Sequence, residues 1–360
     1  MSEEAASQNT GRGISSVGAS NASSTHASML HKFKALREEA LNETESTILA
    51  TLERLVLSAG QDKIPQSRPG TSTSFLSQQE ASTAQVSEAS DGRHSITDKS
   101  DIVRATANKI DELCTDSLED AESFLMSMWE ILLCVVRIIP YDDPGQDRIV
   151  SVLETLRLRA KTTVDLWEKE RRLWRDFPLL SSCIREAWSD PMQDSGNDTV
   201  NIEDASAWVS LNAFAGRITN KGLVDCSIYA IIEIPKALEK DIPPSGPARD
   251  FKLRTANNWI LTSGVKLFKD ARKGDTLDEG ELAATAPGPL YMRTGGQPGL
   301  CMDRWRFWLR RFQELGSDNS NDSVGYEATQ VARRMEKIME ENGRPEARRL
   351  GTTEEDGRTE

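Results

Sequence analysis

Apolar residues recur at three- and four-residue steps along most of the chain, the spacing that gathers them on one face of an α-helix. The clearest run follows Ser117, which can cap a helix together with Asp120, and stops at Pro140. It comprises Leu118, Ala121, Phe124, Leu125, Met128, Trp129, Leu132 and Val136. Runs of this kind predict an all-α fold, a single irregular multi-helix domain of about eight to ten helices.

The pattern changes along the chain and predicts five segments. Residues 1–26 are rich in Ser, Ala, Gly and Asn and are expected to be disordered. Residues 27–59 carry apolar residues at helical spacing and predict one amphipathic helix. Residues 60–100 are expected to form a disordered Ser/Thr-rich linker. Residues 101–342 are expected to form the all-α domain, and residues 343–360 a disordered tail.

The start of one helix is marked clearly, but its end is not. Asp143 as N-cap and Pro144 at the first helical position open the helix. Its apolar spacing continues through Val164 and Trp167 towards Trp174, so we expect one long helix.

Two further helices are predicted from mixed signals. Asp204 is expected to cap a helix that contains Trp208 and Phe214. Residues 226–234 (CSIYAIIEI) are rich in β-branched residues and could form a strand. The flanking helical signals favour a helix instead, with a kink at Pro235.

The charge and hydropathy of the chain exclude some partners. The 360 residues include 44 Lys and Arg against 57 Asp and Glu, a formal net charge of −13. An acidic body repels phosphate backbones, so no nucleic-acid partner is expected. The longest apolar run, residues 131–139, is interrupted by Arg137 and is too short to span a bilayer, so no membrane insertion is expected. Because the N-terminus lacks the apolar core of a secretory signal, we expect a cytoplasmic protein, with the nucleus as an alternative and secretion excluded.

The positions of the histidines and cysteines limit the catalytic and metal-binding chemistry expected of the predicted domain. All three histidines, His26, His31 and His94, precede residue 101, so the predicted domain lacks the commonest general base and zinc ligand. We therefore assign no catalytic, cofactor-binding or metal-ligating residue and no cofactor. The cysteines are odd in number, widely spaced and flanked by apolar residues, which predicts reduced, buried thiols. They are Cys114, Cys134, Cys183, Cys226 and Cys301.

Three stretches of the predicted domain are together similar to a known family. They are WVSLNAFAGRITNKGLVDCSIYAII (residues 208–232), ANNWILTSG (residues 256–264) and GPLYMRTGGQPGLCMDRWRFWLRRFQEL (residues 288–315). In order and spacing they resemble the fungal proteins grouped as domain of unknown function 3632. The resemblance extends over roughly residues 105–342. It implies a fungal, intracellular, helical protein, and it implies no activity.

Two acidic stretches imitate the motifs with which helical terpenoid cyclases bind Mg²⁺-diphosphate, residues 142–147 (DDPGQD) and 197–203 (NDTVNIE). That chemistry needs carboxylates on one helical face, directed into an apolar cavity. Pro140 and Pro144 bracket the first pair of acids, which are therefore expected to lie in a loop, where one of them caps a helix.

Aromatic residues interleaved with arginines could form a stacking platform for bases. Trp305, Trp308 and Phe312 fall at i, i+3 and i+7, which instead predicts an inward stripe with most arginines in solvent. The same interpretation is given to a second group, Trp167, Trp174 and Phe177 beside Arg171, Arg172 and Arg175.

Two remaining motifs carry weak signals. Residues 293–299 (RTGGQPG) could present backbone N–H groups to an anion, but they lack the Gly-Lys-Ser/Thr ending of a phosphate loop, so a connecting turn is expected. Asp225, Cys226, Ser227 and Tyr229 offer nucleophiles without a histidine partner in the domain, which disfavours a hydrolase.

The hypothesis favoured by these observations is a non-enzymatic intracellular helical protein-interaction or scaffold module with protein partners. Its amphipathic helix, residues 27–59, would dock on the domain or on a partner. Two alternatives stay open. One is a helical enzyme or small-molecule-binding protein with an unrecognised pocket, and the other is a nucleic-acid role, which requires a strongly basic face.

Overall fold

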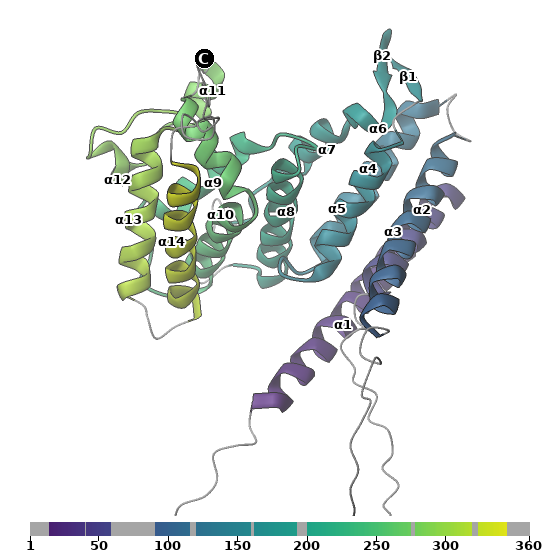
Figure 1. Cartoon of the computed structure of the whole chain (residues 1–360), viewed down its shortest axis with the longest axis horizontal. Helices are drawn as coiled ribbons and strands as arrows, with labels where there is room; N and C mark the ends of the chain where they lie inside the picture. Colours follow the sequence, from purple (N-terminus) through teal and green to yellow (C-terminus); the bar gives the residue numbers. More distant parts are fainter. Residues whose placement is uncertain are drawn as a thin grey trace, which may run out of the picture. The chain divides into compact units, whose positions relative to one another are not determined.

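The computed structural model describes residues 14–39, 41–58, 91–115, 120–159, 162–192, 200–274, 278–318 and 323–343. These residues form fourteen helices and one two-stranded antiparallel sheet, so the predicted all-α class is confirmed (Figure 1). The chain divides into two compact units, Met1–Ser189 and Asp190–Glu360. The division falls inside the expected domain of residues 101–342, and the helices before residue 101 belong to the first unit. The disorder expected of residues 1–13, 60–90 and 344–360 concerns segments outside the described residues.

Unit 1 is built around α2, α4 and α5. α2 packs against α3, α4 and α5, and α4 also packs against α7 and β1. The elements of the unit are α1 (Ile14–Glu38), α2 (Glu43–Leu57), α3 (Asp91–Thr115), α4 (Ala121–Ile138), α5 (Pro144–Arg157), β1 (Thr163–Leu166), β2 (Lys169–Arg172), α6 (Leu173–Asp176) and α7 (Leu180–Ala187).

The single amphipathic helix expected over residues 27–59 is two helices. Asn42 and Glu45 form a capping box, in which the Asn42 Oδ1 accepts from the Glu45 N–H at 2.8 Å and the Glu45 carboxylate accepts from the Asn42 N–H at 3.0 Å. This reciprocal pair satisfies backbone donors that a continuous helix would bond internally, so a new helix starts here. α1 begins at Ile14, inside the segment expected to be disordered.

α2 belongs to the core of unit 1. Its apolar face is buried through Ile48, Leu49, Leu52, Leu55 and Val56, none more than 1 % exposed. The Ser127 hydroxyl of α4 donates to the Glu45 carboxylate at 2.8 Å, at the start of α2. Arg148 of α5 donates to the Leu55 carbonyl at 3.3 Å and to the Ser58 hydroxyl, at the end of α2. The amphipathic segment therefore docks on the body of its own chain.

Two boundaries in unit 1 differ from the sequence expectation. α3 begins at Asp91, within the stretch expected to be linker. α5 does begin at Pro144, capped by Asp143, but it ends at Arg157 rather than continuing towards Trp174. The chain then forms a β-hairpin, in register from Thr163 opposite Arg172 to Leu166 opposite Lys169. The expected cap Ser117 lies outside the described residues.

Aromatic side chains fill the centre of unit 1. The Trp129 ring packs edge-on against Trp174 and Phe177, with ring centroids 6.4 and 6.1 Å away. Each indole N–H has an acceptor, because Trp129 donates to the Pro178 carbonyl at 2.8 Å and Trp174 donates to the Asp111 carboxylate at 2.5 Å. Buried aromatic residues of this kind contribute large apolar areas to a core.

Unit 2 is organised around α10, which packs against α8, α9, α13 and α14. α10 and α8 approach closely because Gly216 faces Thr262: a Cβ at position 216 would lie 2.1 Å from the threonine hydroxyl. The elements are α8 (Ile202–Asn220), α9 (Ser227–Leu238), α10 (Pro247–Lys273), α11 (Glu279–Ala284), α12 (Pro289–Met292), α13 (Met302–Asp318) and α14 (Ser323–Asn342).

The structure answers two questions that the sequence of unit 2 raised: whether residues 226–234 form a helix or a strand, and which residue caps α8. The CSIYAIIEI stretch is helical as favoured, and Pro235 lies inside α9. The cap of α8 is Asn201 and not Asp204, because the Asn201 Oδ1 accepts from the N–H groups of Glu203 and Asp204, at 3.0 and 3.4 Å. An N-cap oxygen satisfies the N–H groups two or three residues ahead, which only Asn201 can reach at this helix start.

Candidate functional site

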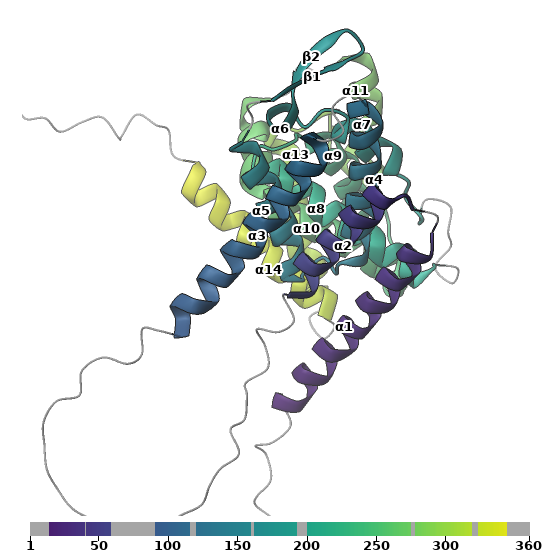
Figure 2. The same cartoon turned by 90° about the vertical axis from the view of Figure 1, so that its right-hand side faces the viewer.

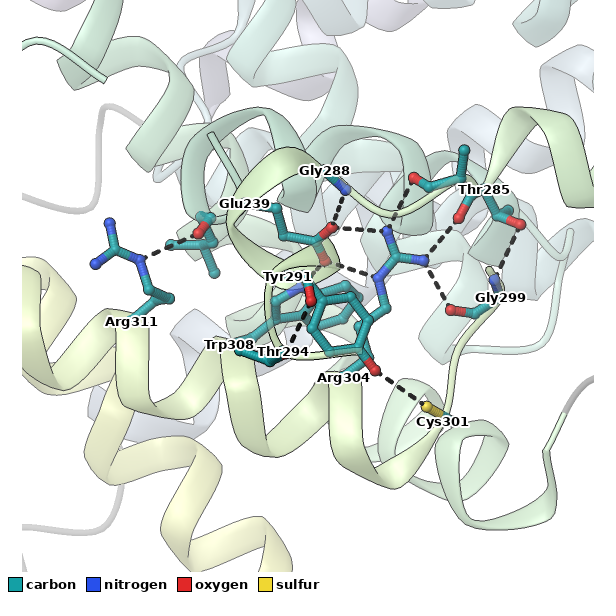
Figure 3. A network of polar contacts seen from close by, with 12 residues as sticks. Glu239, Thr285, Gly288, Tyr291, Thr294, Gly299, Cys301, Arg304, Trp308 and Arg311 are labelled. Atoms are coloured by element: carbon teal, nitrogen blue, oxygen red, sulfur yellow. Dashed lines mark hydrogen bonds and ion pairs between the residues drawn. The ribbon is translucent and has the colours of Figure 1, made fainter. Parts of the chain in front are cut away.

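Unit 2 buries an ion pair between the end of α9 and the first turn of α13. The Arg304 Nε donates to the Glu239 Oε1 at 2.7 Å, and the Arg304 Nη2 donates to the Oε2 at 3.0 Å (Figure 3). Neither side chain has any solvent exposure. Burying two charges is costly unless their remaining hydrogen-bonding groups are also satisfied.

The remaining donors of Arg304 are satisfied by backbone carbonyls. Its Nη1 donates to the carbonyls of Thr285 and Gly299, both at 2.8 Å, and its Nη2 also donates to the Ala286 carbonyl at 3.3 Å. All five guanidinium N–H groups are thereby used. The Tyr291 and Trp308 rings also lie near the cation, each with its centroid 5.6 Å from the guanidinium carbon.

Glu239 accepts two hydrogen bonds besides those of the arginine. The Gly288 N–H donates to the Oε2 and the Trp308 indole N–H donates to the Oε1, both at 2.7 Å. Gly288 has no room for a side chain, because a Cβ there would lie 2.6 Å from the Glu239 Cβ. The carboxylate thus holds the start of α12 and the middle of α13 against the end of α9.

This cluster fixes the loop segment between α11 and α13, which includes the short helix α12. Thr285 and Gly299 bracket that loop, and the Gly299 N–H also donates to the Thr285 hydroxyl at 3.1 Å. Tyr291, within the loop, contacts the Cys301 Sγ through its hydroxyl at 3.6 Å, and burial raises the pKa of Tyr291. Since every donor of Arg304 already has an acceptor, the cluster is a structural lock rather than a site that receives a ligand.

The β-hairpin of unit 1 is a second unusual feature. Its two-residue turn is Trp167–Glu168, with φ of 54° and 62°. Two successive positive φ values are the pattern of a type I′ turn, which favours Asn-Gly because other side chains are strained there. Trp167 is 66 % exposed at the tip. Both views show the hairpin projecting beyond the neighbouring helices of unit 1 (Figures 1 and 2).

The aromatic residues singled out in the sequence divide between core and surface. Trp305, Trp308 and Phe312 are fully buried, which confirms the inward stripe of α13. Arg304 of the same helix is buried too, although most arginines of this stretch were expected to lie in solvent. Trp174 and Phe177 are core residues as expected, whereas the inward placement of Trp167 was wrong because this residue lies at the hairpin turn.

The described residues of the two acidic stretches do not share a helical face. Asp143 caps α5, its Oδ1 accepting from the Gly145 N–H at 2.7 Å, and Asp142 precedes it in an exposed turn. Of the second stretch, residues 197–199 lie outside the described residues and Asn201 caps α8. The expected cap role of the first stretch is confirmed.

The glycine-rich segment 293–299 is a connection between α12 and α13, as expected. Gly295 and Gly299 have φ of 82° and 81°, which a residue with a side chain rarely adopts. The Gly299 carbonyl at the end of this segment accepts a hydrogen bond from the Arg304 Nη1.

Ser227 of the Asp225–Tyr229 region lies close to Lys266 of α10, but the two cannot act as a nucleophile and a base. The Lys266 Nζ lies 3.5 Å from the Ser227 hydroxyl, 2.6 Å from the Asp270 carboxylate and 3.1 Å from that of Asp225. Burial lowers the pKa of Lys266, but the two carboxylates outweigh it and the net shift is upward. A lysine that keeps its proton cannot deprotonate a serine.

The cysteines are all free, but they are not all buried. Cys114, Cys183 and Cys226 are buried, and burial raises their pKa values to about 12, about 11 and about 12. Cys301 is half-buried. Cys134 is exposed on α4, so the expectation of a buried thiol was wrong there.

Metal centres and membrane-spanning helices are two further features to consider in the part of the chain that the structure describes. Within it, no group of three or more His, Cys, Asp or Glu side chains could hold a metal ion. Within the same residues, no helix has the length and apolar character that crossing a membrane requires.

Comparison with known proteins yields one family. The family model described as "Protein of unknown function (DUF3632)" matches residues 129–312, about half of the 360-residue chain. The matched region begins within α4, ends within α13, and contains both the hairpin and the Glu239–Arg304 pair. No curated protein and no solved structure matches the chain. From its family match, the chain belongs to the DUF3632 family, as the resemblance in its sequence indicated.

Proposed function

We propose that this protein is a non-enzymatic, intracellular protein-interaction or scaffold module of the cytoplasm. The observation that carries the proposal is the exposed Trp167 at the tip of the β1–β2 hairpin. Tryptophan is enriched at the energetic centres of protein interfaces, because its large ring buries much apolar area and loses little conformational entropy. A tryptophan placed on a projecting turn is available to a partner without rearrangement of the fold.

The backbone of the turn supports the same proposal. Trp167 and Glu168 both adopt the left-handed region, which costs free energy in the isolated protein. The side chain of Trp167 recovers little of that cost by packing, since two thirds of it is in solvent. Local strain without local compensation is typical of positions that act on another molecule.

The amphipathic α2 has a different role in this account. Its apolar face is buried by α4 and α5, so α2 completes unit 1 and does not present that face to a partner. The protein partner is therefore assigned to the hairpin. The bulk of unit 1 then serves as the scaffold that holds the hairpin in place.

The proposal is tested with the full chain carrying Trp167→Ser. The matched control is Tyr326→Ser, since Tyr326 is an aromatic residue of nearly equal exposure, 63 %, on α14. Tagged proteins are recovered from native extract, and the stoichiometry of co-purifying proteins is measured by mass spectrometry. We expect a stoichiometric partner with the original chain and with the Tyr326 variant, and its loss with the Trp167 variant. Equal recovery by all three proteins would overturn the proposal.

A further inference from the structure

The two faces of the hairpin differ in charge. The register places Asp165 opposite Glu170 and Leu166 opposite Lys169. Because successive side chains of a strand point to opposite faces, Asp165 and Glu170 share one face, and Leu166 and Lys169 share the other. Leu166 is 4 % exposed, packed towards the core of unit 1. The face with Asp165 and Glu170 is consequently the one turned away from that core.

Asp165 and Glu170 form a like-charge pair. Residues directly opposite on antiparallel strands have their Cβ atoms about 4.5–5.5 Å apart, and like charges at such positions are destabilising. Both side chains are exposed, and among the described residues neither has an ion-pair partner. Among the described residues of the hairpin, Arg172 is the cation on this face, and it is paired with Asp176 at 3.3 Å. The outward face therefore keeps an uncompensated charge of two carboxylates beside the exposed Trp167.

Building on the proposed interaction function, we infer that the hairpin tip binds a basic segment of a partner protein, one that presents Arg or Lys next to an apolar side chain. A guanidinium or ammonium group placed between Asp165 and Glu170 replaces their repulsion by two favourable ion pairs. The Trp167 ring covers the neighbouring apolar group or the cation itself. The hairpin alone supplies both the carboxylates and the aromatic ring that bind the partner segment.

An acidic partner or a nucleic acid fits the outward face poorly. Lys169 and Arg171 are also exposed, but the register places them on the same face as Val164 and Leu166, which are buried. A negatively charged partner that reached Trp167 from the outside would meet Asp165 and Glu170 first. These two carboxylates therefore favour a positively charged partner at the hairpin tip.

The probe for this inference is a fluorescein-labelled amphipathic peptide of Arg and Leu, with a matched peptide in which every Arg is Glu. Binding to the full chain is followed by fluorescence anisotropy at two salt concentrations. The variants are Trp167→Ser and the double variant Asp165→Lys with Glu170→Lys. The control is Glu340→Lys with Glu341→Lys, which makes the same change in net charge on the exposed surface of α14.

We expect the Arg peptide to bind the original chain, and binding to weaken at least about tenfold in both hairpin variants while the control changes about twofold or less. Equal weakening in the control would overturn the inference, because the peptide would then respond only to the acidity of the whole chain. Preference for the Glu peptide would overturn it as well. A partner complex from native extract that survives the charge reversal but is lost with Trp167→Ser would overturn the assigned charge and leave the proposed function standing.

Discussion

Glu239 and Arg304 are 65 residues apart in the chain and form a bidentate ion pair without solvent exposure, at 2.7 and 3.0 Å. Three backbone carbonyls, one backbone N–H and one indole N–H surround the two charges, and every donor of the guanidinium is used. The pair therefore ties the end of α9, the loop between α11 and α12, and the first turns of α13 into one arrangement. Its disruption is expected to affect unit 2 far more than the loss of a surface ion pair would.

Replacement of Arg304 by Met is expected to lower the free energy of unfolding by about 3–5 kcal/mol, because it leaves the Glu239 charge buried without its partner. Urea unfolding followed by circular dichroism measures the change. Arg306→Met is the control, since Arg306 is exposed and pairs with Asp303 on the surface. The control is expected to change stability by less than about 1 kcal/mol. A similar small loss for both variants would show that the buried pair is not a lock.

Gly288→Ala is expected to destabilise the protein by about 1–3 kcal/mol, because the added Cβ would lie 2.6 Å from the Glu239 Cβ and 2.7 Å from the Glu239 carbonyl oxygen. The backbone φ of Gly288 is −75°, so the cost comes from the contact and not from the dihedral angle. Gly280→Ala in α11 is the matched change, with its nearest atom at 3.4 Å. Thermal unfolding compares the two, and equal melting temperatures would contradict the close packing at Gly288.

Leu52→Ala is expected to cost about 2–5 kcal/mol of stability, although residue 52 precedes the region matched by the family model. Leu52 is 1 % exposed between α2 and its neighbours, so its loss leaves a cavity in unit 1. Leu30 of α1 is 42 % exposed, and Leu30→Ala is expected to have a much smaller effect. If chemical unfolding gave equal, small changes for the two variants, α2 would not belong to the core.

The stability of the protein is expected to fall as the pH rises from 9 towards about 12. Burial raises the pKa values of Cys114 and Cys226 from 9.0 to about 12, so the folded state keeps two protons that the unfolded state loses in this range. The stabilisation is fully present below pH 9. Urea unfolding of the chain and of a Cys114→Ala, Cys226→Ala double variant at several alkaline pH values measures it. The variant is expected to show a weaker decline, and parallel curves would refute the assignment.

The helical fold was predictable because its signals are local. The stripe of Trp305, Trp308 and Phe312 follows from their spacing alone, and the N-cap and first position of α5 follow from Asp143 and Pro144. The break between α1 and α2 was also encoded locally, since Asn42 and Glu45 have the spacing of a capping box. It was missed because the apolar spacing continues across the break.

The buried pair and the hairpin were not predictable in the same way. Arg304 has the local sequence of a solvated arginine, and its burial depends on Glu239, which is distant in the chain. The hairpin turn has Trp167–Glu168 where Asn-Gly would signal a turn, while Val164 and Trp167 continue the apolar spacing of α5. The residues that depart from local rules are thus the ones that form the lock and the proposed docking tip.

Replacing the turn by Asn-Gly, through Trp167→Asn and Glu168→Gly, tests the central claim most directly. Both new residues tolerate positive φ, so the free energy of unfolding is expected to rise by about 1 kcal/mol or more, since left-handed non-glycine residues cost roughly 1–2 kcal/mol each. The same protein is expected to lose its stoichiometric partner in native extract. A more stable protein without its partner is the predicted result. A more stable protein that keeps the partner would contradict the account.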